Sequence, residues 1–144
     1  MNGVKQISVF LENKSGRLAA VSKILGANDI NIRALCIADT SDFGILRLIV
    51  NDPERAYGVL KESGFTVSAT NVIAVQVPDR PGGLAEALTI LEEAGLNIEY
   101  LYAFVSKVSG RALVILKVED VDRAADLLRG RGIPVPHPEE VYAL

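Results

Sequence analysis

The chain has 144 residues, of which 49% are hydrophobic and 23% charged, and its formal net charge is −3. This composition is typical of a folded chain and excludes intrinsic disorder, while the negative charge disfavours nucleic acid and anionic membranes as partners. Without an apolar run of membrane-spanning length or a signal peptide, and with a single cysteine, the chain is expected to be cytoplasmic. One histidine and one cysteine provide little for metal binding or acid–base catalysis, so no metal, cofactor or catalytic residue is predicted.

The first half of the chain reads as six elements. Alternating apolar and polar residues predict strands, and apolar residues at three- and four-residue steps predict helices. Asp52 and Pro53 suit the start of the second helix and Gly64 suits its end. The predicted elements are a strand at residues 7–11, a helix at 18–28, strands at 31–38 and 45–50, a helix from 53 to 64, and a strand from 65 onward.

The second half repeats the first. At a separation of 66 residues (82 minus 16), Gly16 falls on Gly82 and Asn31 falls on Asn97, and a two-residue shift later pairs Gly64 with Gly132. The second half is therefore expected to contain a strand at 72–77, a helix at 81–94, strands at 97–105 and 112–118, a helix at 121–131 and a last strand within 139–144.

This repeated β-α-β-β-α-β order is the ferredoxin-like pattern. We predict an α+β fold with two such units, residues 1–70 and 71–144, each with an antiparallel sheet that carries its helices on one face. The join is almost continuously β-forming, with a break expected only around residues 69–71. Without a flexible linker, the two units are expected to pack side by side.

The turn after the first strand of each repeat is the most informative feature. Gly16 and Gly82 each stand at the predicted N-terminus of a helix, where free backbone amides and the helix dipole favour the binding of a carboxylate. Asn31 and Asn97 begin the next strand, and a carboxamide can both donate and accept hydrogen bonds. We expect these two points to lie at the same end of the sheet, where they would suit an α-amino acid. Plain turn chemistry explains the same residues equally well.

Two motifs carry a resemblance to a known family. The segments 12–18 and 79–84, each followed by an Asn-Ile pair, resemble the ACT domain, and the whole chain resembles the small stand-alone double-ACT proteins of bacteria. The resemblance implies non-catalytic, regulatory binding of an amino acid at an interface between two ACT units. The ligand-binding residues that it implies are Leu11, Asn13, Ser15, Gly16, Arg17, Leu18, Asn31 and Ile32 in the first repeat, and Asp79, Pro81, Gly82, Gly83, Leu84, Asn97 and Ile98 in the second.

The repeats also depart from the family pattern. Ser15 stands where the family usually has proline, and Asp79 stands where serine-binding members have asparagine. Leu11 and Val77 occupy the position at which some serine-binding members carry a histidine. An amino acid with an apolar or aromatic side chain, or histidine, is therefore expected in preference to serine, at one or both repeats.

An aromatic row forms the second notable feature. Ile98, Tyr100, Tyr102 and Phe104 alternate along one strand, and Leu101, Ala103 and Val105 fill its other face. A strand that is apolar on both faces is buried on both, so the face without helices is expected to meet a second subunit, a ligand or the other repeat. We expect a homodimer.

Two alternatives remain open. The chain could be a ligand-free interaction module that uses the aromatic row. It could also be a small acylphosphatase-like hydrolase, in which Arg17 would bind the anion and Asn31 would position water, although the match to that pattern is faint.

Overall fold

The computed structural model describes residues 2–12, 14–39, 42–104 and 110–144. Its internal contacts divide the chain into two compact units. The N-terminal unit comprises Lys5–Thr70 with Leu144, and the C-terminal unit comprises Asn71–Ala143 with Met1–Val4. Each unit is described below by itself.

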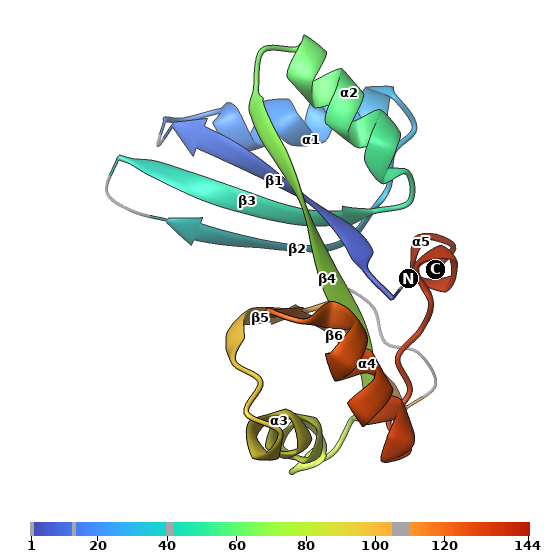
Figure 1. Ribbon diagram of the computed structural model, residues 1–144. Coiled ribbons are helices and arrows are strands. Elements are labelled where there is room, and N and C mark those ends of the chain that lie inside the picture. The colour runs from blue at the N-terminus through green and yellow to red at the C-terminus, as the bar shows by residue number, and fades with distance from the viewer. Residues whose placement is uncertain (1, 13, 40–41, 105–109) are drawn as a thin grey trace. The chain divides into compact units, whose positions relative to one another are not determined.

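The N-terminal unit is an antiparallel sheet with two helices on one face (Figure 1). Its strands lie in the order β2-β3-β1-β4, and β4 contributes its first part to this unit. Side chains from β1, β3 and both helices form one buried core, which includes Ile7, Leu25, Leu48 and Leu60. The elements are β1 (Val4–Glu12), α1 (Arg17–Ala27), β2 (Ile32–Asp39), β3 (Phe43–Val50), α2 (Pro53–Glu62) and β4 (Thr66–Pro78).

The C-terminal unit repeats this plan with strand order β4-β6-β5. Its core again lies between the sheet and the two long helices, and Ile73, Leu91, Leu116 and Leu128 are fully buried there. The predicted fold class is therefore confirmed as antiparallel sheets that carry helices in the ferredoxin-like order. The elements that follow β4 are α3 (Gly83–Glu93), β5 (Ile98–Ala103), β6 (Arg111–Val118), α4 (Val121–Gly130) and α5 (Pro138–Tyr142).

The second helix of each unit begins and ends as the sequence predicts. Asp52 caps α2 by accepting a hydrogen bond from the backbone N–H of Arg55 at 3.2 Å, and Asp120 caps α4 in the same way. At the end of α2, Gly64 adopts a φ of +92° and the backbone N–H of Phe65 donates to the Leu60 carbonyl. This left-handed turn satisfies carbonyls that the helix leaves free.

The end of the chain departs from the prediction. Residues 139–144 were expected to form a strand, but Pro138–Tyr142 is the helix α5. The prolines at 134, 136 and 138 lack the N–H groups that a strand needs, and Pro138 suits the first position of a helix. Glu140 completes the helix start by accepting a hydrogen bond from the His137 backbone at 3.2 Å.

The expected break around residues 69–71 is also absent, since β4 continues from Thr66 to Pro78 as one strand of 13 residues. Asn71 favours turns, but it lies inside β4 together with Ala69 and Thr70. The preference of a residue for strands depends on its context, so the sheet can accommodate an asparagine here.

Arg129 joins three segments of the C-terminal unit. Its Nη1 donates to Asn2 Oδ1 at 2.6 Å, and its Nη2 and Nε donate to the Val135 carbonyl at 2.6 and 3.3 Å. The Asn2 side chain in turn donates to Asp122 at 2.9 Å. The first residues of the chain and segment 133–136 are thereby held against α4. In the described part of the second repeat, no strand follows α4.

Replacing this guanidinium tests its structural role. We expect Arg129→Ala to lower the free energy of unfolding of the C-terminal unit by about 2 kcal/mol, because partly buried hydrogen bonds to a charged group are lost. Urea unfolding followed by circular dichroism measures the change. Arg131→Ala is the matched control: its side chain is exposed and lies 3.9 Å from Glu93, so its effect should stay within about 0.5 kcal/mol. Equal effects of the two substitutions would contradict this role.

Candidate functional site

Two helix starts form the centre of the candidate site. Gly16 precedes α1 with a φ of +87°, and Gly82 precedes α3 with a φ of +85°. Only glycine adopts this left-handed conformation freely, which explains its presence in both turns. Among the described residues, neither helix start has a side-chain cap, because the N-cap residue is a glycine in both. The first turns of α1 and α3 therefore present backbone donors that a small anion can use.

A hollow of about 350 Å³ opens beside the first turn of α1. It contains two of the predicted residues, Leu11 and Arg17. Its lining residues also include three phenylalanines, Phe10, Phe43 and Phe65. Phe65 packs against the core that contains Leu11, whereas Phe10 and Phe43 lie on the other face of the sheet.

Charged side chains of opposite sign stand at this hollow. The Nη2 of Arg17 lies 3.5 Å from Glu12 Oε1, and Lys14 Nζ lies 2.8 Å from Glu12 Oε2. The hydrogen bond from Lys14, with the positive charges of Lys14 and Arg17, lowers the pKa of Glu12 below its ordinary value. The hollow therefore has a carboxylate and a guanidinium beside each other.

The two halves of the predicted site do not meet within one unit. Glu12 pairs with Phe43 at one end of β3, whereas Ile32 pairs with Val50 at the other end. The 8 residues of β3 place those ends about 25 Å apart. The expectation that the glycine turn and the asparagine share one end of the sheet is therefore wrong. The reason is the crossover: the helix between them runs back along the sheet.

The same separation holds in the C-terminal unit. The backbone N–H of Asp79 donates to the Gly110 carbonyl just before β6 begins, whereas Ile98 pairs with Val118 at the end of β6. Asn97 and Ile98 border a different hollow of about 430 Å³. In this unit, too, the turn and the start of the second strand lie at opposite ends of the sheet.

The remaining predicted residues have individual positions. The backbone of Asn31 makes two hydrogen bonds with Asn51: its N–H donates to Asn51 Oδ1 at 2.8 Å, and its carbonyl accepts from the Asn51 N–H at 3.1 Å. Neither bond uses the side chain of Asn31, which is exposed. Gly83 is buried, while the others are exposed or half-buried at the surface of their turns. Those exposed or half-buried residues are Ser15, Gly16, Leu18, Asp79, Pro81, Gly82 and Leu84, and Asn13 lies outside the described residues.

Comparison with known proteins identifies the family. Residues 2–133 match the family described as the ACT domain pair. The chain belongs to the ACT domain pair family. No curated protein matches it.

Solved structures agree with this assignment. Protein BT0572 from Bacteroides thetaiotaomicron is 40% identical, and the alignment covers 99% of this chain and 98% of that one with a TM-score of 0.93. The regulatory subunit of aspartate kinase from Thermus thermophilus shares the fold with a TM-score of 0.64 at 18% identity, over 88% of this chain and 91% of that one. The corresponding subunit from Thermus flavus gives 0.61 at 17% identity, over 90% and 93%.

The aromatic row of the second ACT repeat is shorter than predicted. A register shift between Ile98 and Tyr100 places Ile98 beside the core that the helices cover, whereas Tyr100 and Tyr102 lie on the other face with their rings stacked 6.5 Å apart. A β-bulge reverses the side of every following residue, so Ile98 does not belong to the row. Leu101 on the helix side remains 41% exposed at the sheet edge, and Val105 lies outside the described residues.

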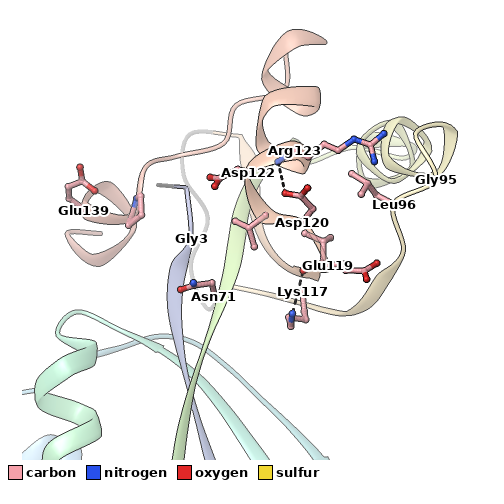
Figure 2. Close-up of a pocket in the computed structure, with 13 residues that line it drawn as sticks. Gly3, Asn71, Gly95, Leu96, Lys117, Glu119, Asp120, Asp122, Arg123 and Glu139 are labelled. Atoms are coloured by element: carbon pink, nitrogen blue, oxygen red, sulfur yellow. Dashed lines mark hydrogen bonds between the residues drawn. The ribbon is translucent and has the colours of Figure 1, made fainter.

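A hollow of about 1230 Å³ in the second ACT repeat is lined by none of the predicted residues (Figure 2). It collects side chains from the first residues of the chain, the end of β6, the start of α4 and α5 (Figure 2). Several of these polar groups already have structural roles: Asp120 caps α4, and Lys117 donates to the Val118 carbonyl. We therefore assign this hollow no binding role.

Neither a membrane-spanning helix nor a metal-binding group of side chains occurs in the described part of the chain. Among the described residues, no helix is long and apolar enough to cross a membrane. Over the same part of the chain, no three histidine, cysteine, aspartate or glutamate side chains form a group suited to a metal ion.

Gly83 offers a test of the second turn. A Cβ at this position would lie 2.0 Å from the Pro78 carbonyl oxygen, so Gly83→Ala must displace backbone. We expect it to lower the free energy of unfolding by about 3 kcal/mol, measured by thermal or urea unfolding. Gly130→Ala in α4 is the control: nothing lies within 4 Å of the added carbon, and it should be neutral or slightly stabilising. A neutral Gly83→Ala would contradict this packing.

Proposed function

We propose that this ACT domain pair is a non-catalytic regulatory protein that binds an amino acid where two ACT units meet. The observation that carries the proposal is the pair of uncapped helix starts at Gly16 and Gly82, in a chain that belongs to the ACT domain pair family. Such a turn offers backbone donors and a favourable dipole to a carboxylate. A regulatory subunit of aspartate kinase shares the fold, which fits a regulatory task.

The geometry of one unit supports an interface site. The turn at Gly16 and the carboxamide of Asn31 lie at opposite ends of the sheet. A ligand of amino-acid size that contacts both motifs must therefore take one motif from each of two units. Binding of this kind favours the arrangement of units that completes the site, and this population shift is how the ligand would regulate a partner.

The same geometry argues against the hydrolase alternative. An acylphosphatase-like site needs an arginine that binds the phosphate and an asparagine that positions the attacking water, close together. Arg17 and Asn31, the residues that could take these roles, stand at opposite ends of β3. A ligand with an apolar or aromatic side chain, or histidine, is favoured over serine because Leu11 and Val77 stand where some serine-binding members of the family carry a histidine.

A thermal-shift screen with the twenty amino acids tests the proposal. A ligand present at 100 times its dissociation constant should stabilise the chain by about 2.7 kcal/mol, which raises the melting temperature by several degrees. Asn31→Ala and Asn97→Ala should reduce the shift without unfolding the chain. The backbone contacts of Asn31 with Asn51 do not need its side chain.

The control for this screen is Ser68→Ala, an exposed change on β4 that should leave the shift intact. Absence of any shift with all twenty amino acids would favour the ligand-free interaction module. A shift that is unchanged in both asparagine variants would contradict the assignment of the two asparagines.

We also infer that the chain forms a homodimer through the edge strand β2. Leu35 and Ile37 on this strand are 40% and 46% exposed, and an edge strand with exposed apolar side chains is a natural pairing surface. Ile37→Lys should shift the dimer towards monomer in sedimentation velocity. Ala27→Lys, at the exposed end of α1, is the control and should leave the distribution unchanged. A monomeric wild-type chain at micromolar concentration would contradict the inference.

A further inference from the structure

The dipeptide Asn2-Gly3 is chemically labile. Asn2 is the one asparagine of the chain that a glycine follows. In such a pair the backbone nitrogen of the glycine can bond to Cγ of the asparagine, ammonia leaves, and a succinimide ring forms. Water then opens the ring and yields aspartate or isoaspartate. Glycine favours the attack because it has no side chain to keep the two groups apart, so Asn2 is where deamidation is expected first.

The packing of the C-terminal unit explains both residues. A Cβ at Gly3 would lie 3.0 Å from Cβ and Cγ of Asn71, which leaves little room for a larger residue (Figure 2). The Asn2 side chain accepts a hydrogen bond from Arg129 Nη1 at 2.6 Å and donates one to Asp122 Oδ1 at 2.9 Å. A carboxamide suits this place because it accepts and donates from neighbouring atoms.

Asp122 and Arg129 act together as a clamp on this amide. They are seven residues apart on α4, so they lie two turns apart on one face of the helix. Asp122 Oδ1 also accepts from the backbone N–H of Asn2 at 3.2 Å, and Arg129 is itself fixed by its bonds to the Val135 carbonyl at 2.6 and 3.3 Å. The clamp therefore holds the backbone and both ends of the side-chain amide.

The clamp opposes ring closure. The reaction must bring Cγ of Asn2 to the backbone nitrogen of Gly3 and turn the planar amide into a tetrahedral centre. Nδ2 then departs as ammonia, so its hydrogen bond to Asp122 is lost. An amide whose oxygen and nitrogen are both held cannot make this movement until the first residues of the chain detach from α4.

Either product breaks the clamp permanently. A carboxylate at position 2 has no donor for Asp122 and places a second negative charge beside it. Isoaspartate in addition lengthens the backbone by one carbon next to Gly3, where Asn71 leaves little room. Detachment that leads to reaction is therefore not reversed.

We propose that Asn2 is a site of spontaneous deamidation whose rate is set by opening of the clamp that Asp122 and Arg129 form. While the first residues lie against α4, the amide is protected. When they detach, the amide is converted, so the product records the time that the chain has spent with this segment open. The inference is independent of ligand binding and of the proposed function.

Peptide mapping by mass spectrometry on the full chain, incubated in mildly alkaline buffer, tests the inference. We expect Asn2 to deamidate about one hundredfold more slowly in the folded chain than in the same chain unfolded in urea, because two hydrogen bonds to charged groups must break first. Asn2→Gln should abolish the product, since the larger ring that glutamine would need forms much more slowly.

Variants localise the protection. Asp122→Ala and Arg129→Ala should each raise the rate in the folded chain about tenfold, since each removes one of the two bonds to the side chain. Asp122→Ala decides if Arg129→Ala does not fold by circular dichroism. Asp126→Ala and Arg131→Ala make the same chemical changes at exposed positions and should keep the wild-type rate.

Leu127→Ala separates the clamp from overall stability. This residue packs against the core from α4, so the change lowers stability but removes none of the bonds to Asn2. Its rate should stay well below that of the clamp variants. Equal rates in Leu127→Ala and the clamp variants, or in the folded and unfolded wild-type chain, would overturn the inference. A slower reaction in Arg129→Ala would also overturn it, because the arginine would then activate the carbonyl.

Discussion

The crossover between the first and second strands of each unit is the constraint on which the site depends. Once Gly16 starts α1, a rigid helix of 11 residues carries the chain about 16 Å back along the sheet before β2 begins. The backbone donors at the helix start and the carboxamide of Asn31 are thereby held at opposite ends of β3. No rearrangement of side chains can close that distance. A ligand of amino-acid size can therefore contact only one of the two motifs within a single unit.

Much of the fold could be predicted because its local signals agree with its long-range packing. Asp52, Pro53 and Gly64 mark the ends of α2, and the structure uses each of them as expected. The C-terminal segment shows where such reasoning stops. The prolines at 134, 136 and 138 remove every second backbone donor of this segment, and Arg129 holds the first residues of the chain against α4. That contact joins residues 127 positions apart, which no local pattern could indicate.

The sequence predicts the two glycine turns of the candidate site, but it does not predict the phenylalanines near the first turn. The left-handed glycines have a strong sequence signature, since a glycine at a helix start is informative by itself. The phenylalanines belong to three different segments, and only the pairing of Glu12 with Phe43 brings the ends of β1 and β3 together. The β-bulge before Tyr100 was equally hidden, because an extra residue in a strand changes neither composition nor alternation until the partner strand is known.

The two repeats differ at the residue that follows the turn glycine. In the second turn the Pro78 carbonyl stands so close to Gly83 that no side chain fits, and the turn can offer only its backbone. In the first turn the corresponding residue is Arg17, whose side chain adds a charge and orders an aromatic ring. The two turns therefore share their backbone geometry but differ in the side chain that follows the glycine, so a duplicated fold does not by itself make the two turns chemically equivalent.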